Sequence, residues 1–405
     1  MTAPGSDPSR IEVVNEISFF GHRPDWQGKT VSMSKTEPQT PAPVGRVRPA
    51  VGALPAYKPG KAAEQAEREY DIAEAIKLAS NENPYPPPAA VIEAVAAACR
   101  GGNIYCDHRA TAVREALADR LGLGVDQVTV GAGSVALLYQ LATAYVDPGD
   151  EAVTPWISFE AYPISVQTMG GLLVRVPLTA DHAFDLDAVA AAVTERTKLV
   201  LLATPNNPTG TAVSTAAVAR LAESIPSDVV VLVDEAYREF ADPALGDPVA
   251  ELLPRFDNVA VARTFSKAFG LASLRVGYVM AHPEVVSAID KCLIPFNVNG
   301  LAQAAALAAL SDEAAAEAQA NIDAIKAERA RIASALTGDG WRIPDAQANF
   351  VWIHLGDRTD QVCIALEQRG VVVRPFSSVG IRVTIGTPAQ NDRFLTALAE
   401  ATQPG

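Results

Sequence analysis

The chain has 405 residues, of which 49% are hydrophobic and 20% charged, as is typical of a soluble globular protein long enough for two domains. Its formal net charge is −14, and it contains neither a long basic run nor an apolar run of about 20 residues, so neither nucleic acid nor membrane is an expected partner. The four cysteines and five histidines are scattered, which predicts reduced thiols in the cytoplasm and no metal site.

The N-terminal part of the chain is expected to contribute little to the core. Residues 1–47 are polar and rich in Pro, Ser and Thr, which predicts a disordered tail. Residues 48–85 are interpreted as an arm, in which Val51–Gly60 is extended because of its Pro and Gly content. A short strand beginning at Ile76 then runs into a turn at Pro84.

Residues 86–300 are predicted to form the larger domain. Ala89–Arg100 and Thr111–Leu121 have the apolar spacing of helices, with Tyr105 in the loop between them. From there, strands and helices such as Ser214–Ser224 alternate. The predicted strands are Val128–Val130, Glu151–Thr154, Gly171–Leu178, Lys198–Ala203, Val229–Val233, Val259–Arg263 and Arg275–Met280.

These strands are apolar throughout, which favours a mostly parallel sheet that is buried on both faces. Ligands of such sheets bind at the carboxyl ends of the strands. Asn207, Asp234 and Lys267 each follow an apolar run, so we expect the three side chains to meet there.

Residues 301–405 are predicted to form a smaller α+β domain. Asp312 to about Leu336 is one long helix, and a final helix covers roughly Asn391–Ala401. The strands between them are Asn349–Ile353, Val371–Arg374 and Ile381–Ile385.

Lys267 is the centre of the predicted chemistry. In isolation, a lysine in a loop is usually a solvated side chain. Arg263 and Arg275 are near it in sequence, and cations or burial lower the pKa of an amine enough for it to form an imine. A Schiff-base lysine, a carboxylate partner for a ring nitrogen and donors for a phosphate are what a pyridoxal phosphate enzyme requires.

Asp234 ends an apolar run, so its carboxylate needs a partner. That partner could be a helix terminus or a salt bridge, or it could be the protonated pyridine nitrogen of the cofactor. Tyr237 and Asn207 are candidates to hydrogen-bond the ring oxygen.

The phosphate is expected at a glycine-rich helix start, Gly131–Ser134, with Thr264, Ser266 and Arg275 completing its cradle. Gly131–Ala136 also fits the GxGxxA dinucleotide pattern, with Asp150 as a possible ribose-binding acid, so an NAD-dependent oxidoreductase stays open as an alternative. Phe159 could stack on a cofactor ring, although an isolated aromatic side chain more often belongs to the core.

Taken together, the motifs resemble the histidinol-phosphate aminotransferase group of fold-type-I enzymes. The likeness runs in order from about residue 50 to the end. It rests on the segments 78–84 (LASNENP), 131–134 (GAGS), 205–210 (PNNPTG), 234–237 (DEAY), 263–267 (RTFSK) and 380–386 (GIRVTIG).

This resemblance implies a large domain with a mostly parallel seven-stranded sheet, a smaller α+β C-terminal domain, an N-terminal arm that packs on the small domain and the partner subunit, and pyridoxal 5'-phosphate as cofactor. Lys267 is then the Schiff-base lysine and the base that moves the substrate proton, Asp234 the partner of the ring nitrogen, and Tyr237 and Asn207 the ligands of the ring oxygen. The implied phosphate ligands are Ala132, Gly133, Thr264, Ser266, Arg275 and, from the partner subunit of a homodimer, Tyr105.

The same resemblance places Arg382 on the substrate's anionic group, and Tyr57 and Arg374 at further substrate-facing positions. Phe159 stands where many relatives have tyrosine. The segments 155–163 (PWISFEAYP), 347–352 (QANFVW) and 371–376 (VVVRPF) are most similar to actinobacterial aromatic aminotransferases. Histidinol-phosphate aminotransferase is the close alternative, and a pyridoxal phosphate protein of other chemistry is a third possibility.

Overall fold

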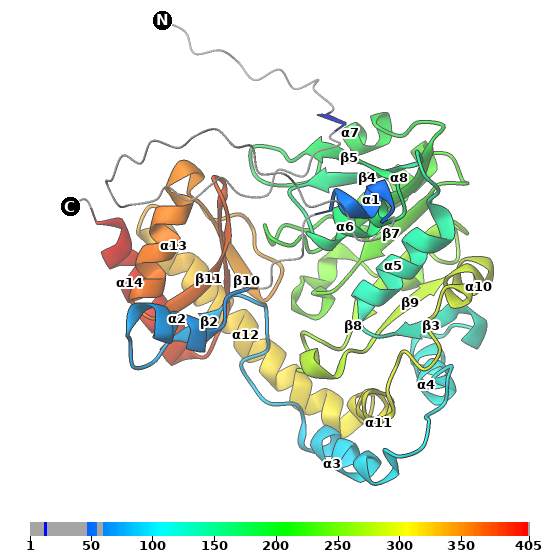
Figure 1. The fold of residues 1–405 in the computed structure, drawn as a ribbon, viewed down its shortest axis with the longest axis horizontal. Helices are drawn as coiled ribbons and strands as arrows, with labels where there is room; N and C mark the ends of the chain where they lie inside the picture. The colour runs from blue at the N-terminus through cyan, green and yellow to red at the C-terminus, as the bar shows by residue number, and fades with distance from the viewer. Residues whose placement is uncertain (1–11, 14–46, 55–59, 404–405) are drawn as a thin grey trace, which may run out of the picture.

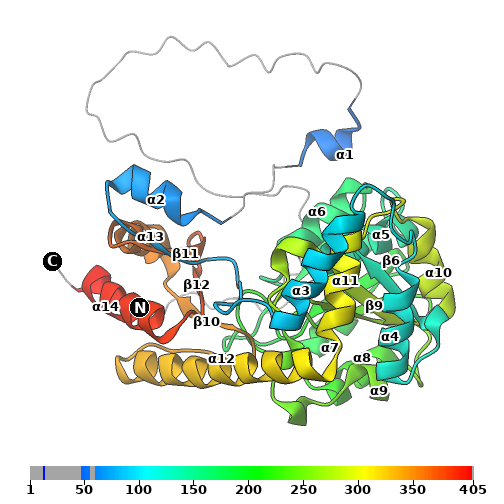
Figure 2. The same ribbon diagram turned by 90° about the horizontal axis from the view of Figure 1, so that it is seen from below.

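The computed structural model describes residues 12–13, 47–54 and 60–403. They form two sheets that lie side by side, and the long helix α12 (Asp312–Gly338) runs along both of them (Figures 1 and 2). Most of the predicted tail (residues 1–47) and Tyr57 lie outside the described residues.

The larger sheet confirms the predicted mostly parallel arrangement of seven strands, and a two-residue strand, β1 (Glu12–Val13), is added at one edge. Among the described strands of this sheet, β1 and β9 run in the direction opposite to the other six, which are parallel to one another. In spatial order after β1, the strands are β5 (Leu172–Pro177), β4 (Glu151–Trp156), β6 (Thr197–Ala203), β7 (Val230–Asp234), β8 (Val259–Thr264), β9 (Gly277–Ala281) and β3 (Val128–Gly131).

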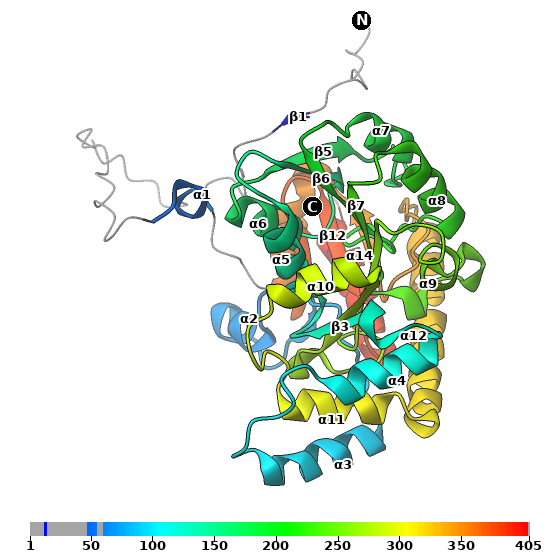
Figure 3. The same cartoon turned by 90° about the vertical axis from the view of Figure 1, so that its right-hand side faces the viewer.

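Both faces of this sheet are covered by helices, which explains why its strands are apolar throughout. Successive side chains of a strand point to opposite faces, so Leu199 and Leu201 of β6 belong to one core and Val200 and Leu202 to the other. Figure 3 shows α5 (Ser134–Tyr145), α6 (Ala161–Thr168) and α10 (Pro283–Lys291) on one face and α7 (Leu186–Ala191) and α8 (Thr215–Ser224) on the other.

Of the remaining helices around the larger sheet, α4 contacts β3, α11 contacts α4, and α1 contacts α6. α3 packs along α11 (Figure 2), and both contact α12. These helices are α1 (Pro49–Gly52), α3 (Ala89–Ala98), α4 (Thr111–Leu121), α9 (Pro248–Glu251) and α11 (Gly300–Ala309). Among the described residues, no helix combines the length and the apolar character that a bilayer span requires.

The smaller sheet has the order β10 (Phe350–His354), β12 (Gly380–Thr384), β11 (Val371–Phe376) and β2 (Ile76–Leu78). Strand β2 comes from the N-terminal arm and pairs in parallel with β11, so the arm completes a sheet built from the C-terminal part of the chain. The helices α2 (Ala63–Tyr70), α12, α13 (Thr359–Gln368) and α14 (Pro388–Thr402) pack around it.

Three local expectations differ from the structure. Arg275 has a left-handed backbone (φ 58°), so β9 begins only at Gly277 and not at Arg275 as predicted. Residues 51–52, predicted to begin an extended segment, belong to a helical turn that starts at Pro49, because proline is well suited to a first helical position. Helices α2, α10, α11 and α13 were not predicted, and α11 is so rich in alanine that its apolar period is weak.

Candidate active site

A cavity lies at the carboxyl ends of β6, β7 and β8, between the two sheets. Asn207 follows β6, Asp234 ends β7 and Lys267 follows β8, and all three line the cavity. The other predicted site residues that line it are Phe159, Tyr237, Thr264, Ser266, Arg275, Arg374 and Arg382. The smaller sheet contributes Arg374 and Arg382, so the cavity has walls from both halves of the molecule.

The amine of Lys267 has the environment of a nucleophile. Its Nζ donates to the carbonyl oxygen of Ser80 at 3.1 Å. Burial lowers the pKa of Lys267 to about 7, and the positive charges of Arg382 and Arg275 act in the same direction. A large share of the amine is therefore neutral near neutral pH, which imine formation requires.

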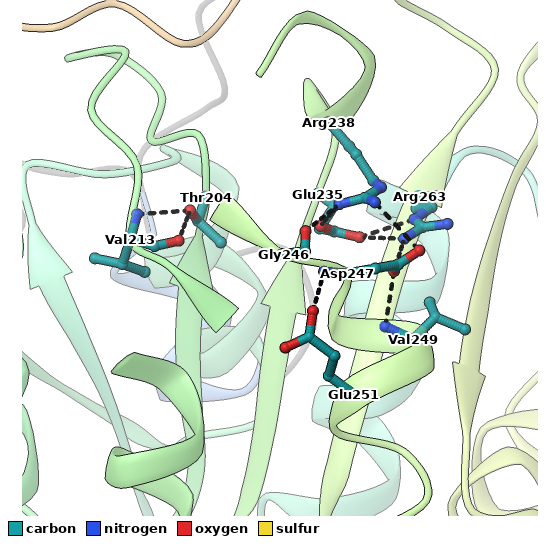
Figure 4. A network of polar contacts seen from close by, with 9 residues as sticks. All are labelled: Thr204, Val213, Glu235, Arg238, Gly246, Asp247, Val249, Glu251 and Arg263. Atoms are coloured by element: carbon teal, nitrogen blue, oxygen red, sulfur yellow. Dashed lines mark hydrogen bonds and ion pairs between the residues drawn. The ribbon is translucent and has the colours of Figure 1, made fainter. Parts of the chain in front are cut away.

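Arg263 was expected as one of the cations near Lys267, but it does not line the cavity and binds two carboxylates instead. Its guanidinium donates to Glu235 at 2.8 Å and to Asp247 at 2.9 Å, and Arg238 joins the same two carboxylates (Figure 4). Glu235 directly follows Asp234, and Arg263 belongs to β8, so this network connects the ends of the two strands that carry Asp234 and lead to Lys267.

Replacing Arg263 by alanine is expected to lower the free energy of unfolding by about 3–5 kcal/mol, because the carboxylate of Glu235 then stays buried without its closest cation. The matched control is Arg255→Ala. Arg255 forms a 2.7 Å pair with Glu223 on the surface, and its loss is expected to cost less than about 1 kcal/mol. Urea titrations at fixed protein concentration measure both, and equal losses would contradict a bracing role for Arg263.

Asp234 has one satisfied and one orphaned oxygen. Its Oδ2 accepts the hydroxyl of Tyr162 at 3.1 Å, whereas its Oδ1 is buried and accepts no hydrogen bond from the described residues. Burial raises the pKa of Asp234 to about 6, against the opposing effects of the Tyr162 hydroxyl and the Ala236 backbone N–H. An orphaned carboxylate oxygen at a cavity wall is suited to a ligand that carries a proton on nitrogen.

Tyr162 was not predicted as part of the site. It is fully buried on α6, and it looks in the sequence like any core aromatic. A tyrosine that is buried completely usually has a hydrogen-bond partner, and that general rule was the only available signal.

Tyr237 is held by the N-terminal arm. Its hydroxyl accepts from Nδ2 of Asn81 at 2.9 Å. Asn81 has a left-handed backbone and is itself bound to Thr384 of β12 and to Asn349, so three distant segments meet at this asparagine. Asn81 lies in the segment 78–84 that carried the family resemblance, but its part in orienting Tyr237 depends on the tertiary structure.

The start of α5 forms a cradle for an anion. Gly133 has φ +80°, and a Cβ there would lie 2.5 Å from Nη2 of Arg275. Thr264 donates to Ser266 at 2.9 Å, and Nη1 of Arg275 lies 3.5 Å from the Ser266 hydroxyl. The N-terminus of α5, two hydroxyls and a guanidinium therefore lie together at the cavity, a combination that suits a phosphate. Ala132 and Gly133 directly precede Ser134, which lines the cavity.

The position of this cradle excludes the dinucleotide alternative. The GxGxxA segment follows β3, which lies at the edge of the sheet and pairs antiparallel with β9. A dinucleotide fingerprint requires a parallel βαβ unit at this place. Asp150, the possible ribose ligand, accepts the backbone N–H of Asp147 in a local turn.

Arg382 is buried beside Asn207. Its Nη1 donates to Oδ1 of Asn207 at 2.5 Å and its Nη2 to the carbonyl of Ala79 at 2.6 Å. Arg374 lies opposite Arg382 in the register of β11 and β12, and it forms a 2.7 Å ion pair with Glu160. Glu160 also lines the cavity and was not predicted as a site residue.

The two remaining aromatic candidates differ in position. Phe159 lines the cavity and packs edge-on against Tyr162. Tyr105 is 82% exposed, stacks on Phe296 and is not among the residues that line the cavity of its own chain.

Comparisons with known proteins identify the family of the chain. The family model of aminotransferase class I and II matches residues 73–398. An aromatic amino acid aminotransferase of Streptomyces coelicolor is 46% identical over 368 residues, 91% of this chain and 99% of that protein. One of Streptomyces avermitilis is 46% identical over 364 residues, 90% of this chain and 97% of that protein.

Among solved structures, the histidinol-phosphate aminotransferase of Sinorhizobium meliloti in complex with pyridoxal-5'-phosphate has a TM-score of 0.81 and 30% identity. It covers 89% of this chain and 98% of that chain. The resemblance inferred from the motifs is thereby confirmed. Because the family model matches residues 73–398 and the 46% identical Streptomyces coelicolor relative covers 91% of the sequence, the chain belongs to the family of class I and II aminotransferases.

Proposed function

We propose that the protein uses pyridoxal 5'-phosphate to transfer the amino group of an aromatic L-amino acid, such as phenylalanine or tyrosine, to a 2-oxo acid such as 2-oxoglutarate. The observation that carries the proposal is one cavity that presents the low-pKa amine of Lys267 and the orphaned oxygen of Asp234. The choice of an aromatic donor is supported by the names of the Streptomyces relatives.

The residues present fit the cofactor. Oδ1 of Asp234 is suited to the ring nitrogen, and the cradle of Ala132, Gly133, Thr264, Ser266 and Arg275 to the phosphate. Tyr237 and Asn207 are suited to the ring oxygen and Phe159 to the ring face, since all three line the cavity. When bound, pyridoxal phosphate supplies an aldehyde for the amine and a ring that accepts electrons from the substrate.

The chain's own groups then act on the substrate. Arg382 binds its α-carboxylate with a guanidinium, whose planar fork matches a carboxylate. Lys267 takes the proton from the substrate Cα as a neutral amine and returns it during transfer. The carboxylate of Asp234 stays ionised beside the protonated ring nitrogen, which reverses the effect of burial on its pKa.

We further propose a cytoplasmic homodimer, in which Tyr105 enters the partner's site. Its support is an exposed apolar surface around Tyr105, which includes Ile104 (72% exposed), Ile294 (71%) and Phe296 (41%). Isolated apolar side chains are common on surfaces, but a cluster of this kind is typical of an interface. The four cysteines are all free thiols, which suits a reducing compartment.

The experiment that tests the substrate is a panel of amino donors. The enzyme is incubated with 2-oxoglutarate and phenylalanine, tyrosine or histidinol phosphate, and kcat/KM is compared. Phenylpyruvate and glutamate are the expected products from phenylalanine. A higher kcat/KM for histidinol phosphate than for both aromatic donors would favour the alternative, which the likeness to the Sinorhizobium structure supports.

The rate at which cofactor-free protein captures pyridoxal phosphate is expected to rise with pH through about 7 and then level off. The reason is that only the neutral amine of Lys267 attacks an aldehyde, and an ordinary lysine would keep gaining reactivity up to about pH 10. Absorbance of the captured cofactor measures the rate. A small amine of ordinary pKa, measured in parallel, corrects for ionisation of the cofactor itself.

The lowered pKa of Lys267 also makes the stability of the cofactor-free protein depend on pH. Since the pKa of Lys267 in the folded protein lies below its unfolded value of 10.5, this group makes the cofactor-free protein more stable above that pH. Its contribution disappears as the pH falls through about 7. In the capture experiment, a rate that keeps increasing well above pH 7 would contradict the lowered pKa of Lys267.

A further inference from the structure

The pair formed by Glu160 and Arg374 connects the two halves of the cavity. Glu160 lies at the start of α6, beside the larger sheet, whereas Arg374 belongs to β11 of the smaller sheet. Their side chains are only 16% and 11% exposed, and Oε2 of Glu160 lies 2.7 Å from Nη2 of Arg374. The pair is therefore largely desolvated, and both members line the cavity that also contains Lys267.

The two arginines of the smaller sheet have different partners. Arg382 donates to two neutral acceptors, the amide oxygen of Asn207 and the carbonyl of Ala79. Arg374, its neighbour across the strand pair, donates to a carboxylate. The positive charge of Arg374 is therefore neutralised within the protein, although two adjacent guanidiniums would otherwise form a strong site for a doubly charged anion.

We propose that Glu160 is a specificity-determining residue: it pairs with Arg374 and so weakens the binding of substrates with a second anionic group, the acceptor 2-oxoglutarate included, relative to those with an uncharged side chain. This inference rests on the proposed function and deepens it. It assigns the discrimination to a residue of the α6 segment, which also supplies Phe159 and Tyr162.

The physical reason is a competition for one guanidinium. A second carboxylate or a phosphate that binds Arg374 must displace Glu160, which then loses its cation in a poorly solvated place, and this is costly. An aromatic side chain does not bind Arg374, so the ion pair between Glu160 and Arg374 stays intact beside it. The discrimination therefore comes from a penalty on the wrong ligand as well as from contacts with the right one.

The test compares two unreactive ligands on the cofactor-loaded enzyme by calorimetry: glutarate, with two carboxylates, and 3-phenylpropanoate, with one carboxylate and an aromatic ring. In Glu160→Gln, the negative charge that competes for Arg374 is removed, so a second carboxylate can bind there. The dissociation constant of glutarate is expected to fall by roughly tenfold, the usual contribution of a charge-assisted hydrogen bond, and that of 3-phenylpropanoate to change by less than about twofold. For the amino acceptor, 2-oxoglutarate, KM is expected to fall in parallel.

Two further variants make the result specific. In Glu160→Gln/Arg374→Gln the gain for glutarate is expected to disappear, because the guanidinium responsible for it is gone. Glu195→Gln removes one negative charge from an exposed position and is expected to change neither constant.

If the dissociation constants of both ligands change equally in Glu160→Gln, the proposal is overturned, and the ion pair only holds the two halves of the cavity together. Weaker glutarate binding would also overturn it, since Glu160 would then orient Arg374 for anions. These outcomes are separate from the fate of the proposed function, which fails if the wild-type enzyme transaminates neither phenylalanine nor tyrosine.

Discussion

Replacing Lys267 by alanine is expected to abolish transamination, with kcat lower by at least about a thousandfold, because both the nucleophile and the base are removed. The visible absorbance of the lysine-bound cofactor is expected to disappear as well. Absorbance spectra and single-turnover assays with phenylalanine measure the two effects independently. A variant that keeps both the spectrum and the activity would refute the assignment of Lys267.

Two companion variants separate the chemistry of Lys267 from its charge. Lys267→Arg keeps a cation in the cavity, but a guanidinium does not lose its proton in proteins, so this variant is expected to be as inactive as Lys267→Ala. Lys198→Ala removes a lysine from the start of β6 and is expected to keep the wild-type rate. Substantial activity in Lys267→Arg would show that a positive charge alone suffices.

Replacing Asp234 by asparagine is expected to lower kcat by roughly a hundredfold to a thousandfold, the usual effect of removing one preorganised electrostatic group from an active site. An amide has nearly the same shape as the carboxylate, but it has no charge to keep the ring nitrogen protonated. The electron-accepting character of the ring is then weaker. Asp257→Asn, which changes an exposed aspartate, is the matched control and is expected to keep its rate.

The same substitution is expected to change the stability of the cofactor-free protein in the opposite direction. The pKa of Asp234 is raised from 3.8 to about 6 by burial, so this group favours the folded state below its unfolded pKa, and the benefit is lost as the pH rises through about 6. The amide of Asp234→Asn does not ionise, so the variant does not lose stability in this way as the pH rises. The stability of the variant relative to wild type is therefore expected to increase between about pH 4 and about pH 7 in urea titrations.

No increase over this range would contradict the raised pKa of Asp234. An unchanged kcat would contradict its proposed contact with the ring nitrogen. If Asp234→Asn has the wild-type kcat and also shows the pH-dependent gain in stability, then Asp234 affects the stability of the fold but not catalysis. An active site that is destabilising until its cofactor binds is a common compromise between stability and function.

The order of the strands' apolar runs and the polar residues after them were enough to predict the sheet and the segments that carry the site. Apolar runs such as those before Asp234 and Lys267 predict buried parallel strands, and polar residues that follow such runs lie at one edge of the sheet because parallel strands end on the same side. These are local signals. Lys267, Asp234 and Asn207 could therefore be placed together without coordinates.

The side chains that surround these three residues depend on how the chain packs. Arg263 is near Lys267 in sequence, but it binds Glu235, and the cation with the largest effect on the pKa of Lys267 is Arg382 of the smaller sheet. Tyr162 and Asp234 are 72 residues apart, and Glu160 and Arg374 are 214 residues apart. No local pattern contains such pairs. They form only when strand register, helix packing and the junction of the two sheets fix where each side chain points, because charges interact through space and not along the chain.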